Sequence, residues 1–278
     1  MAQTATLERL LKRDRAVTLF GLTALCACAW LYLLTGAGIG MSAWQMSRLA
    51  LLPHTPAANM ANMPGMAREF SDGIVVWALM LVMWWVMMIA MMLPSAAPAI
   101  LLYARIYRHA LAQGQRQGAI APTGAFATGY FLIWLLFSLV AALLYRVLER
   151  SDGVSAITMA SQSMWLSAGV LFAAGLYQFS PVKNACLSRC RSPASFLAQQ
   201  WRPGMMGALR LGALHGAYCV GCCWLMMALL FVGGVMNLAW IAMLTLLVLV
   251  EKLAPAGPWV GRGAGIVLIG WGIATLAV

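Results

Sequence analysis

The sequence predicts an all-α integral membrane protein, a polytopic bundle of about seven spans with a cytoplasmic N-terminus. Of its 278 residues, 63% are hydrophobic and 9% are charged. A soluble domain has about a quarter of its residues charged. Several apolar runs approach the roughly 20 residues that a helix needs to cross a bilayer. The basic residues gather in the short connections between these runs, as topology rules require.

The spans follow from these apolar runs. We expect a basic cytoplasmic segment over residues 1–16 and a single transmembrane domain over residues 17–278. The predicted spans are 17–35, 74–93 (with a continuation to Leu102 as an alternative), 122–147, 158–179, 208–233, 237–251 and 263–278. The last two are short, so six spans with one re-entrant segment is the alternative. We expect the first run to be an uncleaved span.

The charges predict the orientation. Basic residues precede the first span and fill the connections after the second, fourth and sixth spans, all on one side. The positive-inside rule makes this side cytoplasmic and places the C-terminus outside. The excess of 18 Lys and Arg over 7 Asp and Glu is therefore explained by topology. We expect the lipid bilayer, and no nucleic acid, to be a partner.

The most informative motif is HGAYCVGCCWLMM at residues 215–227. Helical spacing puts its donors on one stripe: His215, Cys219, Cys222 and Met226, with Cys223 beside them. Imidazole, thiolate and thioether suit a soft or borderline metal such as Cu(I) or Zn(II). An ionisable residue inside a span is usually functional. The alternative for His215 is a neutral histidine hydrogen-bonded between helices.

The second predicted span is rich in methionine. Met80, Met87 and Met91 lie within a narrow arc of a helix and could contact a soft metal. The alternative is that methionine serves as a flexible apolar filler. Pro94 lacks a backbone donor and is expected to kink or break this helix.

A second methionine group lies between the first two spans, on the side predicted to be outside. Met60, Met63 and Met66 are spaced three residues apart. Thioethers cannot form disulfides, so they can hold Cu(I) where thiols would be oxidised. The alternative is an interfacial loop whose methionines rest on the bilayer.

A cysteine pair lies on the predicted cytoplasmic side between the fourth and fifth spans. Cys186 and Cys190 share a face if this segment is helical. The neighbouring bases are expected to lower the thiol pKa and favour thiolate: Lys183, Arg189 and Arg191. Two sulfurs could hold a linear Cu(I), whereas tetrahedral zinc needs two more ligands. The alternative is two incidental cysteines in a basic loop.

The sequence also argues against several function classes. No Asp or Glu lies within the core of a predicted span, which disfavours a proton-coupled pump. No nucleotide-binding motif indicates ATP-driven transport or a dehydrogenase. We expect the protein not to be an enzyme.

The chain resembles a bacterial family of predicted metal-binding integral membrane proteins, a domain of unknown function. Three segments carry the resemblance: Met83–Ser95, Pro181–Pro193 and Leu211–Met227. The resemblance implies a multi-span protein of the bacterial inner membrane with a metal site, and no established activity. Copper is inferred from the donor types, with zinc as the alternative.

Together these features predict a membrane protein that binds a soft metal, with Cu(I) favoured. It would pass the ion across the membrane or hold it for a partner, either a metallochaperone or a recipient metalloenzyme. Two alternatives stay open. One is a thiol–disulfide relay through Cys186/Cys190 and Cys219/Cys222. The other is a non-catalytic structural subunit of a membrane complex.

Overall fold

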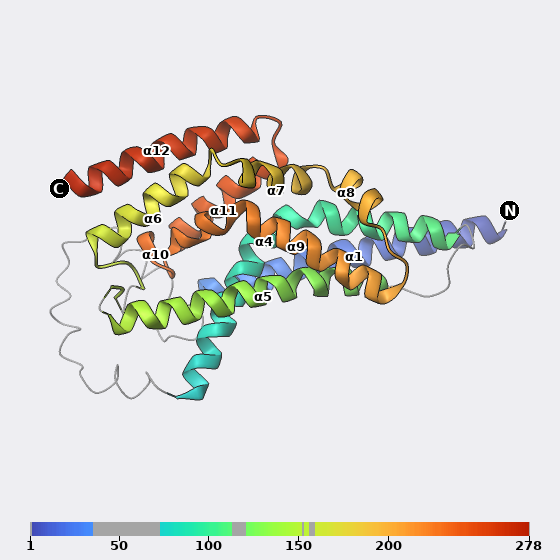
Figure 1. Ribbon diagram of the computed structural model, residues 1–278. Helices are drawn as coiled ribbons and strands as arrows, with labels where there is room; N and C mark the ends of the chain where they lie inside the picture. The colour runs from blue at the N-terminus through green and yellow to red at the C-terminus, as the bar shows by residue number, and fades with distance from the viewer. Residues whose placement is uncertain (1, 36–72, 113–120, 152, 156–158, 278) are drawn as a thin grey trace.

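A computed structural model describes residues 2–35, 73–112, 121–151, 153–155 and 159–277. The elements formed by these residues are helices (Figure 1): α1 (Ala2–Leu34), α4 (Ile74–Ala112), α5 (Ala121–Arg150), α6 (Met164–Tyr177), α7 (Pro181–Arg191), α8 (Pro193–Gln200), α9 (Gly204–Ala228), α10 (Leu230–Gly233), α11 (Leu238–Leu253) and α12 (Gly257–Ala277). Within the described ranges, β-pairing is limited to an isolated bridge between Val154 and Ser161. The all-α prediction is confirmed.

Five helices among the described residues are long and apolar enough to cross a membrane. Their apolar stretches are Ala16–Leu34, Ile74–Ala110, Thr123–Arg150, Gly204–Gly233 and Gly257–Ala277. The predicted spans 158–179 and 237–251 correspond to α6 and α11, which are shorter, with 14 and 16 residues. The membrane class is therefore supported, whereas the count of seven spans and the cytoplasmic N-terminus remain predictions.

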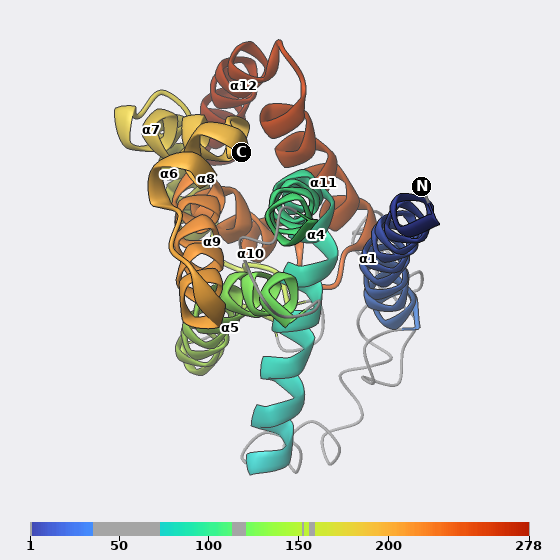
Figure 2. The same ribbon diagram turned by 90° about the vertical axis from the view of Figure 1, so that its right-hand side faces the viewer.

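Helix α4 continues through its prolines instead of breaking at Pro94. It also contains Pro98, and Figures 1 and 2 show that its course bends. A proline at position 94 leaves the carbonyl of residue 90 without its helical donor. The indole Nε1 of Trp30 on α1 donates to this Ala90 oxygen at 3.2 Å. A side chain from a neighbouring helix thus supplies the bond that Pro94 cannot, so the helix bends without ending.

The fourth predicted span, 158–179, corresponds to the shorter helix α6, and a short interruption separates α6 from α7. Helix α6 ends at Tyr177, and α7 begins at Pro181 after the N-cap residue Ser180, whose hydroxyl accepts from the backbone N–H of Val182. A serine N-cap followed by proline at the first helical position is a strong start signal. The Tyr177 hydroxyl donates to the carbonyl of Gly221 on α9, so the interruption is held against α9.

Small residues allow α9 to pack closely against α5. A Cβ atom at Gly212 would lie 1.9 Å from the backbone oxygen of Phe126, and one at Gly129 would lie 2.1 Å from that of Leu209. Neither contact is compatible with a side chain, so both glycines are required by the approach of the two backbones. This packing, together with α7 on another side, buries one face of α9.

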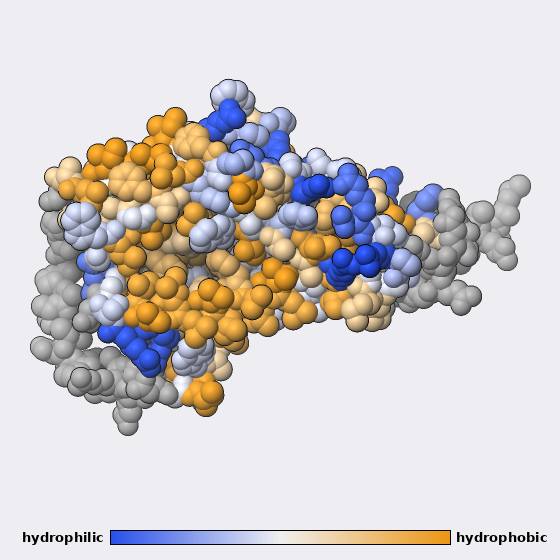
Figure 3. Space-filling view, viewed as in Figure 1, coloured by the Kyte–Doolittle hydropathy of each residue, from blue (hydrophilic) through white to orange (hydrophobic). Residues whose placement is uncertain are grey.

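The outer surface is largely apolar. Figure 3 shows hydrophobic side chains over much of the visible face, with hydrophilic side chains gathered mainly toward its ends. Large exposed side chains include Phe20 on α1 and Trp165 on α6, at 77% and 73% exposure. Such a surface is suited to lipid contact and not to water.

Candidate metal centre

The three cysteines of α9 lie on its buried face. Cys219, Cys222 and Cys223 are each 1% exposed, and all are free thiols. The thiols of Cys222 and Cys223 both donate to the backbone oxygen of Cys219, at 3.1 and 3.0 Å. The thiols of Cys219, Cys222 and Cys223 are also close enough to one another to interact electrostatically. The sulfurs therefore form a row along α9.

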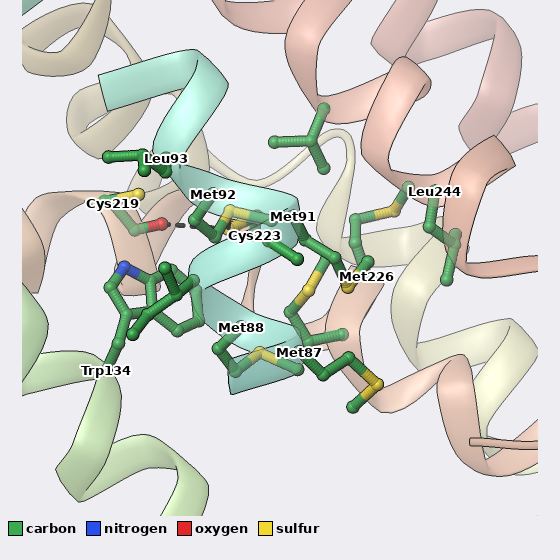
Figure 4. Close-up of a cluster of buried hydrophobic side chains, with 14 of the residues drawn as sticks. Met87, Met88, Met91, Met92, Leu93, Trp134, Cys219, Cys223, Met226 and Leu244 are labelled. Atoms are coloured by element: carbon green, nitrogen blue, oxygen red, sulfur yellow. Dashed lines mark hydrogen bonds between the residues drawn. The ribbon is translucent and has the colours of Figure 1, made fainter. Parts of the chain in front are cut away.

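A methionine of α4 meets this row. The Cys223 Sγ lies 3.8 Å from the Met92 Sδ, which joins a thiol of α9 to a thioether of α4. Figure 4 shows Met92 and its neighbours on α4 beside Cys223 and Met226. Of the predicted α4 ligands, Met87 and Met91 are buried and Met80 is half-buried. Sequence reasoning missed Met92, although helical spacing places Met88, Met92 and Ser95 on one face.

Lys252 of α11 lies beside the same thiols and the Met92 thioether. Its Nζ lies 2.9 Å from the Cys219 Sγ, 3.2 Å from the Ser95 Oγ and 3.9 Å from the Met92 Sδ. The hydroxyl of Tyr130 on α5 is 3.1 Å from the same Cys219 sulfur. A cation and a hydroxyl thus converge on one thiol, an arrangement that stabilises a thiolate.

Lys252 was also missed, because its position at the end of α11 indicated a solvated cytoplasmic charge. Its side chain is in fact buried, with 5% exposure. The signal available in the sequence was the pairing of Glu251 and Lys252 within an apolar run. Adjacent residues point in directions about 100° apart on a helix, so the two charges can have different neighbours within the bundle.

Helix α7 brings the predicted cytoplasmic cysteine pair to the row. The Cys190 thiol is hydrogen-bonded to Cys222. A Cβ atom at Gly221 would lie 2.8 Å from the Cys186 Sγ, so the missing side chain lets α7 approach α9 here. The segment is helical, as the shared-face interpretation required. Two groups expected to be separate are therefore neighbours.

The predicted effect of the nearby bases on Cys186 and Cys190 is wrong. The hydrogen bond with Cys222, together with burial, raises the pKa of Cys190, and burial raises the pKa of Cys186. Two of the bases are directed elsewhere: Lys183 donates to a Glu251 carboxylate oxygen at 2.6 Å, and Arg191 donates to the Glu251 backbone oxygen at 2.6 Å. Both basic groups therefore bind to α11 and do not stabilise a thiolate on α7.

A polar cluster lies beside the sulfurs, at the interruption between α6 and α7. Gln178 accepts a hydrogen bond from Lys183 and donates its amide to the Met226 Sδ at 2.9 Å. The Oε1 of Glu251 is buried and has no hydrogen-bond partner. This cluster ties α7 and α11 to α9.

His215 lies in an aromatic enclosure one turn before Cys219. The rings of Phe126, Tyr130 and Phe196 lie 6.1, 5.8 and 5.6 Å from the imidazole, centroid to centroid. The imidazole Nδ1 is buried without a hydrogen-bond partner. A buried polar atom without a partner is costly, so it marks a position that a ligand could satisfy.

The donors do not form a closed shell. In the part of the chain that the structure describes, no three His, Cys, Asp or Glu side chains are gathered into a metal-holding group. Met60, Met63 and Met66 lie outside the described residues. What the structure brings together is a row of thiols with thioethers alongside, a donor set that favours Cu(I) over harder ions.

The family comparison agrees with this chemistry. A family model described as "PpoB2: Copper chaperone" matches residues 81–275, from α4 to α12. The match includes the described candidate ligands except Met80. It supports a copper-related, metal-binding family, whereas the particular family that the sequence resembles remains a prediction. No curated protein and no solved structure matches the chain.

Proposed function

Because the chain belongs to the PpoB2 copper chaperone family, we propose that it binds Cu(I) among the thiols of α9 and passes it on by ligand exchange. The observation that carries the proposal is the contact of Cys223 Sγ with Met92 Sδ at 3.8 Å. It joins a thiol and a thioether from two helices in a buried place. Copper is here the cargo, and the protein is its carrier and not an enzyme.

The centre of the proposed site is the thiol pair Cys219 and Cys223 with the Met92 thioether. The two cysteines are four residues apart and so share a face of α9. Thiolate is the form that binds metal. The Lys252 ammonium, 2.9 Å from the Cys219 sulfur, favours this form in a place that excludes water.

His215 is proposed as an additional ligand. It precedes Cys219 by one helical turn, and its Nδ1 has no other partner. Coordination would satisfy a buried nitrogen that has no hydrogen-bond partner, so metal binding would offset the free-energy cost of burying it.

Transfer is proposed to run along the row of sulfurs. Cys190 contacts Cys222, and Cys222 contacts Cys223, so neighbouring thiols connect α7 to the centre. On the other side, the thioethers of Met87 and Met91 continue along α4. Exchange between adjacent soft ligands would move the ion without leaving it bare in a low-dielectric surrounding.

The ends of the route complete the proposal. Cys186 and Cys190 would receive or release copper at the cytoplasmic face, and Met60, Met63 and Met66 would do so outside. The partner would be a metallochaperone or a recipient metalloenzyme, and the site of action the bacterial inner membrane. Zinc is the alternative ion.

A thiol–disulfide relay is a second candidate, because the Cys190 thiol contacts Cys222. A relay would exchange a dithiol for a disulfide between these two positions and would not need Met92. Thiol trapping before and after oxidation distinguishes it from copper binding.

The experiment is a Cu(I) titration of the full chain, purified without oxygen in detergent, against a chromogenic Cu(I) chelator. We expect about one Cu(I) per chain for the wild type, with at least a hundredfold loss of affinity in a Cys219→Ser/Cys222→Ser/Cys223→Ser variant. The matched control is Cys26→Ser/Cys28→Ser on α1, which should bind as the wild type does. Equal binding by the α9 variant would contradict the proposal.

A further inference from the structure

The charges buried beside the thiol row give Lys252 a second role. We propose that Lys252 makes the centre selective for a monovalent ion over a divalent ion, by supplying one fixed positive charge. This inference rests on the proposed function, because it concerns the same thiols and the same ion.

The other buried charges of the described residues are already paired. Arg146 forms an ion pair with Glu149 on α5 at 3.4 Å, and Lys183 forms one with Glu251 at 2.6 Å. The net charge of each ion pair is zero. Lys252 is the remaining buried charge in that part of the chain.

The groups that face Lys252 are uncharged or are thiols. From α4 they are the Met92 thioether and the Ser95 hydroxyl, and from α9 the Cys219 thiol. The Tyr130 hydroxyl of α5 meets the same Cys219 sulfur. From α7, the Cys190 thiol is near enough to interact with the ammonium. The nearby carboxylate, Glu251, is directed to Lys183.

The sum of charges then depends on the ion. Two thiolates and Cu(I) carry a net charge of minus one, which the Lys252 ammonium cancels. Two thiolates and Zn(II) carry no net charge, which leaves the ammonium uncompensated in a buried place. An uncompensated buried charge is strongly unfavourable.

A third thiolate would restore the balance for a divalent ion, but the geometry disfavours it. The thiols of α9 lie along one helix, and no three His, Cys, Asp or Glu side chains of the described residues surround a common point. Tetrahedral zinc needs ligands on several sides of the ion. A two-thiolate centre with a thioether therefore fits the arrangement better.

The test compares Zn(II) and Cu(I) affinities of the full chain in detergent without oxygen, each measured by competition with a chelator of known affinity. Two unit charges a few ångström apart in a protein interior change a binding constant by about a hundredfold or more. We therefore expect Lys252→Met to raise the ratio of Zn(II) to Cu(I) affinity by about a hundredfold. Lys252→Arg, which keeps the charge, should stay within about threefold of the wild-type ratio.

Two further variants keep the test decisive. Arg262→Met removes an exposed positive charge on α12 and should leave the ratio unchanged. Lys252→Gln replaces Lys252→Met if the latter does not fold, as judged by gel filtration and circular dichroism. An unchanged ratio in a folded, copper-binding Lys252 variant would overturn the inference alone. Absence of thiol-dependent Cu(I) binding in the wild type would overturn it together with the proposed function.

Discussion

Two buried lysines of neighbouring helices, Lys183 on α7 and Lys252 on α11, have different kinds of partner. Lys183 is held by a carboxylate oxygen of Glu251 at 2.6 Å and by the amide oxygen of Gln178. Lys252 is held by a thiol, a thioether and a hydroxyl. The first has a permanent counter-charge, whereas the second has one only when Cys219 is ionised.

The Lys183–Glu251 pair therefore has a structural role, whereas the Lys252–Cys219 pair belongs to the proposed metal centre. Glu251 and Lys252 are adjacent on α11. Glu251 pairs with Lys183 of α7, whereas Lys252 contacts the Cys219 thiol of α9. The Lys183 pair fixes the relative position of α7 and α11. The Lys252 region can change its charge when an ion binds, because its counter-charge comes from a metal ligand. Substitutions in the two regions should therefore have separable effects.

The largest effect is expected from Glu251→Gln, which leaves Lys183 buried without a counter-charge. Breaking one side of a buried ion pair costs about 3–5 kcal/mol of the free energy of unfolding. The measurement is denaturant unfolding in detergent. Copper bound per folded molecule should be unchanged, since Glu251 is not a proposed ligand.

The double variant Lys183→Met/Glu251→Met serves as its control. Replacing both partners by apolar groups of similar volume is close to neutral or stabilising. A double variant as unstable as Glu251→Gln would show that the pair is not the cause. A Lys252→Met variant as unstable as Glu251→Gln would show that the two regions are alike.

His215→Phe is expected to have the next largest effect, with opposite signs for stability and binding. The added ring fits among Phe126, Tyr130 and Phe196 and removes the unbonded Nδ1, so stability should rise by about 1 kcal/mol. Loss of a nitrogen ligand should lower Cu(I) affinity by about thirtyfold. Thermal unfolding and Cu(I) competition measure the two effects. Unchanged affinity would remove His215 from the proposed ligands.

Gly221→Ala tests whether α7 must touch the thiol row. The new Cβ would lie 2.8 Å from the Cys186 Sγ, and such overpacking costs about 1–3 kcal/mol. The matched control is Gly270→Ala on α12, where a Cβ meets nothing within 4 Å. Equal stabilities for the two variants, measured by thermal unfolding, would contradict the close approach of α7.

The smallest effect is expected from Met92→Leu. This swap nearly conserves volume, so the free energy of unfolding should change by less than about 1.5 kcal/mol. Loss of the thioether should weaken Cu(I) binding by about tenfold. Met80→Leu, at a half-buried position on the same helix, should bind copper as the wild type does. If Met80→Leu weakens binding and Met92→Leu does not, the thioether has been assigned to the wrong residue.

The helices and the sulfur-rich motifs could be read from the sequence because they depend on local patterns. Apolar runs indicated the helices, and helical spacing placed Cys219 and Cys222 on one stripe with Cys223 beside it, all of which lie on the buried face of α9. The continuation of α4 through Pro94 was predicted only as an alternative, because it depends on a donor from Trp30, sixty residues before the Ala90 carbonyl that accepts the bond.

The same limit applies to the charges of the site. The bases beside Cys186 and Cys190 suggested lowered pKa values, but their partners lie on α11. The role of Lys252 depends on three contacts with α4 and α9. Sequence neighbours predict an electrostatic environment only when no long-range partner competes for them.

The interruption between α6 and α7 has a consequence for the biogenesis of the protein. Helix α6 has 14 residues and is about 21 Å long, shorter than the roughly 30 Å hydrocarbon core of a bilayer. Its main packing partner, α12, follows α11 and is therefore synthesised well after α6. Alone in lipid, α6 would expose the unpaired backbone groups at its end. We therefore expect α6 to enter the bilayer only after α12 has been synthesised. Truncation of the chain before α12 should then leave an unstable protein.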